Sequence, residues 1–88
     1  MSILSIVQEF IAETVLYGDI PATIDPDKDL IAAGLVDSLA IMQLILFVEE
    51  RFKVPVADIE VVPDNFRTLN LIKSFIENKQ LVQQQAAQ

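Results

Sequence analysis

The sequence predicts an all-α fold, a small bundle of three main helices plus one short helix. Two observations lead to this prediction. Apolar residues recur at three- and four-residue spacing in three segments, which is the period of a helix with one buried face. The β-branched run at residues 59–62 has no second strand to pair with, and a lone strand is not stable.

The first helix is expected to begin after Ser2, a favourable N-cap residue, and to stop near Gly18. Residues 18–37 contain two prolines and five aspartates, which predicts a long loop. A loop of that length in a compact domain is usually functional or disordered. We expect this one to be ordered, attached to the core by Leu30, Ile31 and Leu35.

The second helix should run from Ser38 to about Phe52. It is apolar almost all round, and so small a domain cannot cover it on every side, so part of its apolar surface should be exposed. We expect two stripes on this helix. The core stripe is Met42, Ile45 and Val48, with Phe52 one turn further, and the outward stripe is Leu39, Gln43 and Leu46.

The remainder of the chain predicts a loop and a last helix. Residues 54–65 are expected to form a loop, with one helical turn around residues 63–66. Thr68 is the expected cap of the last helix. The apolar stripe of that helix is Leu69, Ile72, Phe75 and Ile76. We expect residues 1–79 to form one domain and the Gln-rich tail, residues 80–88, to fray.

Composition excludes several classes of function. The chain has no cysteine and no histidine, which removes thiol chemistry and the commonest general base and metal ligand. Its net charge of −7, with six scattered basic residues, argues against nucleic-acid binding. An acidic surface instead favours basic patches on partner proteins. No targeting segment and no membrane span is evident, so we expect a cytoplasmic protein.

The alternating carboxylates Asp25, Asp27 and Asp29 invite comparison with a calcium-binding loop. The later positions of such a loop do not fit, because Leu30 stands where the turn needs glycine and Val36 stands where a bidentate glutamate is needed. A solvated acidic loop explains the pattern better, and we expect no metal site.

Asp37 and Ser38 stand at the start of the second helix, where either side chain would serve as an ordinary cap. A serine needs a positioned base to act as a nucleophile, and this chain has no histidine to supply one. If Ser38 takes part in chemistry, another enzyme therefore attaches a group to it. The amides and dipole of a helix N-terminus stabilise an anion by about 0.3–1 kcal/mol, which suits a phosphodiester.

The pattern Leu30-x-x-x-Gly34-Leu35-x-Asp37-Ser38-Leu39 resembles the phosphopantetheine attachment region of acyl and peptidyl carrier proteins. The resemblance covers nearly the whole chain and implies a carrier rather than an enzyme. It implies that Ser38 bears a 4′-phosphopantetheine arm donated by coenzyme A. It also implies that Asp37 helps to position the modifying enzyme's metal and cofactor, and that Leu39 lies on the face read by partners.

The second helix departs from the pattern of fatty-acid carriers, which place carboxylates early in this helix. Ala40, Gln43 and Leu46 stand at those places here. This favours a stand-alone monomeric carrier with a hydrophobic docking face, serving aminoacyl, peptidyl or specialised acyl pathways. The docking residues we expect are Leu39, Gln43, Leu46 and Glu49.

The partners implied by the resemblance are a phosphopantetheinyl transferase, an acyl- or aminoacyl-activating enzyme and downstream enzymes. The alternative is an unmodified acidic helical adaptor, which would use the same apolar second helix as a docking ridge.

Overall fold

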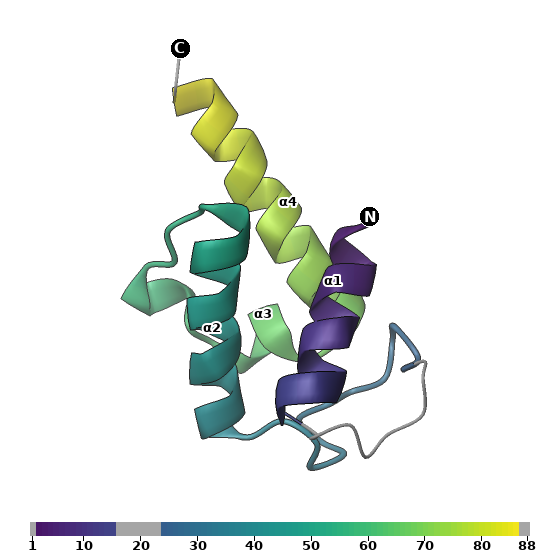
Figure 1. Ribbon diagram of the computed structural model, residues 1–88. Coiled ribbons are helices and arrows are strands. Elements are labelled where there is room, and N and C mark those ends of the chain that lie inside the picture. The colour runs from purple at the N-terminus through teal and green to yellow at the C-terminus, as the bar shows by residue number, and fades with distance from the viewer. Residues whose placement is uncertain (1, 16–23, 87–88) are drawn as a thin grey trace.

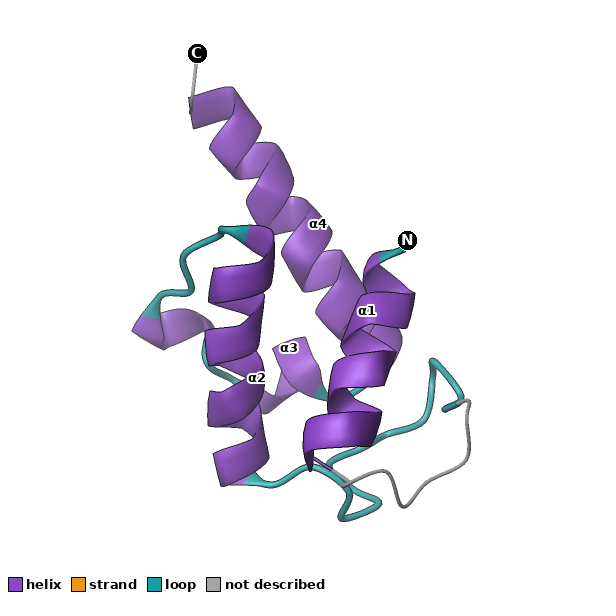
Figure 2. Cartoon of the chain, in the orientation of Figure 1, coloured by secondary structure: helices purple, strands orange, loops and turns teal. Residues whose placement is uncertain are grey.

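The computed structural model describes residues 2–15 and 24–86 of the chain, and within these residues it contains helices and loops but no strand (Figures 1 and 2). Three longer helices and one short helix α3 make up the bundle, so the all-α prediction is confirmed. In chain order the elements are α1 (Ile3–Phe10), the π-helical turn η1 (Ile11–Val15), α2 (Ser38–Phe52), the 3-10 turn η2 (Asp58–Glu60), α3 (Pro63–Phe66) and α4 (Leu69–Ala86).

The core lies between α1, α2 and α4, and α3 closes it with a single phenylalanine. Val7 of α1 and Leu44 of α2 are almost fully buried, and the ring of Phe66 lies 5.3 Å from that of Phe75. The four residues predicted as the buried stripe of the last helix are all buried: Leu69, Ile72, Phe75 and Ile76. Apolar residues at helical spacing therefore locate this part of the core correctly.

Side-chain hydroxyls cap the first and last helices as predicted. Ser2 Oγ accepts a hydrogen bond from the backbone N–H of Ser5 at 3.1 Å. Thr68 Oγ1 accepts from the N–H of Leu71 at 3.0 Å. Each bond satisfies an amide that has no partner inside its own helix. The predicted stop at Gly18 lies outside the described residues.

The segment leading into α2 is attached to the junction between α3 and α4. Leu30 is fully buried, its N–H donates to the carbonyl of Arg67 at 2.8 Å, and its own carbonyl accepts from the N–H groups of Leu35 and Val36. Ile31 and Leu35 are half-buried. The described part of this segment is therefore anchored chiefly by Leu30, one of the three residues expected to attach it.

Two of the three aspartates that resemble a calcium loop are engaged in the same attachment. Asp27 Oδ1 accepts from Asn70 Nδ2 at 2.7 Å, and Asp29 Oδ2 pairs with Arg67 at 3.1 Å. The N–H of Ala32, followed by the Arg67 guanidinium, holds the pKa of Asp29 below its ordinary value despite partial burial. These carboxylates thus have a structural explanation that requires no metal ion.

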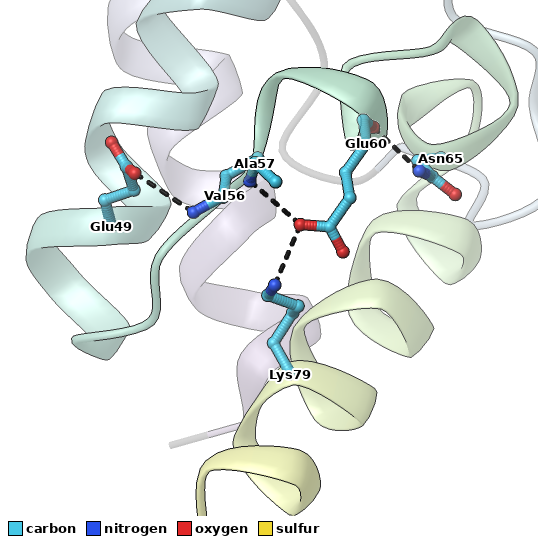
Figure 3. Close-up of polar contacts among 6 residues, drawn as sticks. All are labelled: Glu49, Val56, Ala57, Glu60, Asn65 and Lys79. Carbon is cyan, nitrogen blue, oxygen red and sulfur yellow. Dashed lines mark hydrogen bonds and ion pairs between the residues drawn. The ribbon is translucent and has the colours of Figure 1, made fainter.

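The loop after α2 is held by a second polar network, drawn in Figure 3. Glu49 Oε2 accepts from the N–H of Val56 at 3.1 Å. Glu60 Oε1 accepts from the N–H of Ala57 at 2.9 Å and from Lys79 Nζ of α4 at 2.8 Å. The Lys79 hydrogen bond, followed by the Ala57 hydrogen bond, holds the pKa of Glu60 below its ordinary value. Together these contacts fix the loop to α2 and α4.

Helix α4 continues past residue 79 to Ala86 and extends beyond the other helices (Figure 1). Gln83 Nε2 donates to the carbonyl of Lys53 at 2.8 Å, next to the end of α2. Lys53 ends α2 in the left-handed conformation, with φ of 57°. The domain boundary at residue 79 and the fraying of residues 80–88 stay predictions.

Candidate functional site

The start of α2 is shaped by two residues with separate tasks. Gly34 has φ of 76°, a conformation that strains any residue with a side chain, and its N–H closes a turn onto the carbonyl of Ile31 at 3.0 Å. Three residues later Asp37 is the N-cap, and its Oδ1 accepts from the N–H of Ala40 at 2.9 Å. The glycine turns the chain and the aspartate begins the helix.

Ser38 is the first residue of α2, and its side chain is exposed. Its hydroxyl makes no hydrogen bond to any residue that the structure describes. Because Asp37 performs the capping, the fold does not need the Ser38 hydroxyl. The sequence alone left capping as the plain explanation of both residues, and the geometry separates them.

A phosphodiester fits at this position. The first-turn amides of a helix have no intrahelical acceptors, and the positive end of the helix dipole favours an anion. The exposed Ser38 hydroxyl gives such a group room to point into solvent. No group of three or more carboxylates that could hold a metal ion occurs in the described parts of the chain.

Next to Ser38, α2 presents an apolar surface. Leu39 is 67% exposed, Leu46 63% and Met42 52%. We call these three residues the α2 docking face. Gln43 is exposed beside them, whereas Glu49 is half-buried and bonded to Val56. The exposed apolar surface predicted for this helix is therefore present.

The placement of Met42 in the core was wrong. Successive residues of a helix are rotated by about 100° about its axis, so the side chains of Met42 and Val48, six positions apart, point about 120° apart. Steps of three residues therefore did not keep these residues on one face. The residues of α2 that are buried are Ala40, Leu44, Ile45 and Val48. Apolar residues also recur every four positions, at Ala40, Leu44 and Val48. Choosing this stripe as the buried one would have left Met42 on the exposed face.

The family of the chain follows from comparison with known proteins. Residues 4–76 match the family described as the phosphopantetheine attachment site. The chain belongs to that family. No individual curated protein matches it significantly.

Membership establishes several of the sequence-based predictions. This protein is a phosphopantetheine carrier, and carriers of the family are not enzymes. Their prosthetic group is 4′-phosphopantetheine, and their partners include a phosphopantetheinyl transferase and acyl-handling enzymes. The family assignment favours the carrier over the unmodified adaptor. Among the helices described, none combines the length and the apolar character that a membrane crossing requires.

Proposed function

We propose that Ser38 is the attachment residue and that the carrier holds acyl or aminoacyl groups as thioesters. The observation that carries this proposal is the division of labour at the start of α2. Asp37 caps the helix, and Ser38 keeps an exposed hydroxyl that no described residue engages. When bound, the prosthetic group supplies the thiol that the sequence itself lacks.

Attachment requires a base, and the chain has no histidine to supply one, so we assign that base to the transferase. Ser38 Oγ forms the new bond to phosphorus, and the pyrophosphate bond of coenzyme A breaks. Adenosine 3′,5′-bisphosphate leaves, and the proton of the Ser38 hydroxyl passes to the base of the transferase. Asp37 uses only its Oδ1 for capping. Its Oδ2 is the atom we assign to positioning the transferase's metal and cofactor.

The α2 docking face supports a partner that binds through apolar contact. Leu46 and Gln43 are exposed where fatty-acid carriers place carboxylates, while Ala40 is buried and lies off the exposed face. Leu39, Met42, Gln43 and Leu46 are therefore the residues we propose to contact an activating enzyme. We place Glu49 at the edge of this surface, because it is half-buried and bonded to Val56. This composition favours aminoacyl, peptidyl or specialised acyl cargo over bulk fatty-acid synthesis.

The test of attachment is intact mass spectrometry of the chain after incubation with coenzyme A and a broad-specificity phosphopantetheinyl transferase. We expect the mass of one phosphopantetheine to be added. Ser38→Ala should abolish the addition while the helical circular-dichroism signal stays near that of the wild type. Ser74→Ala is the matched control, because Ser74 is an exposed serine on α4. Addition that persists in Ser38→Ala would place the arm elsewhere and defeat the proposal.

A further inference from the structure

Most polar contacts between the described loop before α2 and the helices are made by two residues near the start of α4. Arg67 lies between α3 and α4, and Asn70 lies in the first turn of α4. The Arg67 guanidinium donates to Asp29 at 3.1 Å, and the carbonyl of Arg67 accepts from the N–H of Leu30 at 2.8 Å. Asn70 bonds to an earlier part of the loop. Arg67 therefore holds the part of the loop that lies closer along the chain to Asp37.

Leu30 connects Arg67 to the residues at the start of α2. The N–H of Leu30 donates to the Arg67 carbonyl, and the carbonyl of Leu30 accepts from the N–H of Val36 at 3.1 Å. Val36 is buried, 3% exposed, and directly precedes Asp37 in the chain. Two successive backbone hydrogen bonds thus join Arg67 to the residue before Asp37. They help to set the direction in which the Asp37 carboxylate leaves the backbone.

The side chain of Arg67 bridges two acids that belong to different parts of the fold. Its Nη1 donates to Asp29 Oδ2 of the loop at 3.1 Å, and its Nη2 pairs with Asp64 Oδ1 of α3 at 3.3 Å. Asp29 Oδ1 in turn accepts from the N–H of Ala32 at 2.8 Å, two residues before the Gly34 turn. Without the guanidinium, the two carboxylates would repel each other as like charges. The bridge therefore keeps this part of the loop against α3.

Stability alone does not explain the position of the Arg67 guanidinium. Its Nε is buried and has no hydrogen-bond partner among the described residues. A buried N–H without an acceptor destabilises a fold. More than a third of the Arg67 side chain is exposed, and ion pairs at such exposure contribute little to stability. What the guanidinium does achieve here is to link the loop before Ser38 to α3.

We propose that Arg67 is a positioning residue for attachment at Ser38 and that it acts through Asp37. Arg67 holds the loop so that Asp37 Oδ2 points toward the metal and cofactor of the transferase while Asp37 Oδ1 caps α2. A displacement of about 1 Å at such a group can slow a reaction by as much as about a hundredfold. The inference rests on the roles proposed for Asp37 and Ser38, and it adds a residue that is bonded to neither.

Attachment kinetics with the full unmodified chain, coenzyme A and a broad-specificity phosphopantetheinyl transferase test this role. Arg67→Gln should lower kcat about fivefold and leave the KM for the carrier within about twofold, because the α2 docking face is unchanged. Asp29→Asn should act in the same way, since asparagine can still accept from Ala32 but offers Arg67 no charge. Lys79→Gln is the matched control. It removes the ion pair with Glu60 in the other loop (Figure 3) and should leave kcat unchanged.

A double-mutant cycle separates positioning through Asp37 from a general loosening of the fold. Asp37→Asn should slow attachment by itself while it keeps most of the cap. Adding Arg67→Gln to Asp37→Asn should slow attachment less than about twofold further, because the carboxylate through which Arg67 acts is already absent. Effects that multiply, a wild-type kcat for either single variant, or an equal loss in Lys79→Gln would each overturn the proposal. Failure of the attachment site itself gives a different result, which is mass added to Ser38→Ala.

Discussion

Two leucines of α2, two positions apart, have opposite environments. Leu44 is 1% exposed and packs in the core, whereas Leu46 is 63% exposed on the α2 docking face beyond Ser38. The two side chains have the same chemistry, so hydrophobicity does not distinguish a residue that stabilises the bundle from one that we propose to contact a partner. Angular position on the helix does. The exposed face keeps apolar surface that folding alone does not require.

The largest effect expected from this comparison is on stability. Leu44→Ala should lower the free energy of unfolding by about 2–5 kcal/mol, as deletion of a buried leucine does, and Ile45→Ala should behave similarly. Leu46→Ala should change it by less than about 0.5 kcal/mol, because the side chain is mostly solvated. Urea midpoints with unchanged slopes measure the difference. Equal losses for Leu44→Ala and Leu46→Ala would mean that the assignment of faces is wrong.

The opposite ranking is expected when loading by an activating enzyme is measured. Leu39→Ala and Leu46→Ala should each lower the kcat/KM of loading about tenfold, equivalent to the loss of roughly 1.4 kcal/mol of contact with the enzyme. Met42→Ala should do the same, since Met42 belongs to the exposed face. Val82→Ala, an exposed apolar change on α4, serves as the control. Normal loading by all three α2 variants would remove the docking role.

The start of α2 offers a comparison of two adjacent side chains. Asp37→Ala should cost about 1 kcal/mol of stability through loss of the cap, whereas Asp37→Asn should retain most of it. Ser38→Ala should change the free energy of unfolding by less than about 0.5 kcal/mol, because its hydroxyl has no partner in the described fold. Thermal and urea unfolding of the three variants measure these effects. A loss from Ser38→Ala equal to that from Asp37→Ala would make Ser38 a structural residue.

The contribution of Glu60 to stability, in the loop that follows α2, can be tested by varying the pH. Glu60→Gln should lower stability at pH 7 by about 1 kcal/mol, because it weakens the bonds to Lys79 and Ala57. The pKa of Glu60 is depressed in the folded protein, so this contribution is present above the ordinary glutamate pKa of about 4.3 and is lost as pH falls through the folded value. Unfolding curves of the two proteins should therefore converge at low pH. A gap that is constant from pH 7 to pH 3 would contradict this assignment.

The smallest effect is expected from salt on loading. If partners bind the α2 docking face through apolar contact, moving from low to physiological ionic strength should slow loading only slightly. Exposed ion pairs each contribute about 0–1 kcal/mol and are screened. Loading rates across a salt series measure this. A steep fall would mean that Glu49 and Glu50 dominate docking instead.

Local patterns in the sequence predicted the elements well. Apolar spacing and capping residues, which are signals between residues a few positions apart, predicted three features. These are the bounds of α2, the turn at residues 63–66 and the buried stripe of α4. The β-branched run at residues 59–62 did not become a strand, as expected from the lack of a partner strand, and part of it lies in η2.

Contacts between distant residues could not be predicted from such patterns. Asp27 meets Asn70 across 43 positions, and Arg67 meets Asp29 across 38, and nothing in the local sequence links these pairs. The structure also assigns tasks to Asp37, the N-cap of α2, and to Glu49, within α2, which the sequence left open. Only the structure shows that Asp37, and not Ser38, caps the helix with its side chain. Only the structure shows that Glu49 accepts a hydrogen bond from the N–H of Val56.

The capping of α2 by Asp37 has a thermodynamic consequence. A ligand changes the folding equilibrium only as far as it binds the folded and unfolded chains differently. Because the Ser38 hydroxyl makes no hydrogen bond to any residue that the structure describes, a group attached there alters that equilibrium only through contacts of its own. The loaded and unloaded states of the protein can then share one unfolding midpoint. Cargo can be gained and lost repeatedly while the proportion of folded chains, and hence exposure to proteolysis, stays constant.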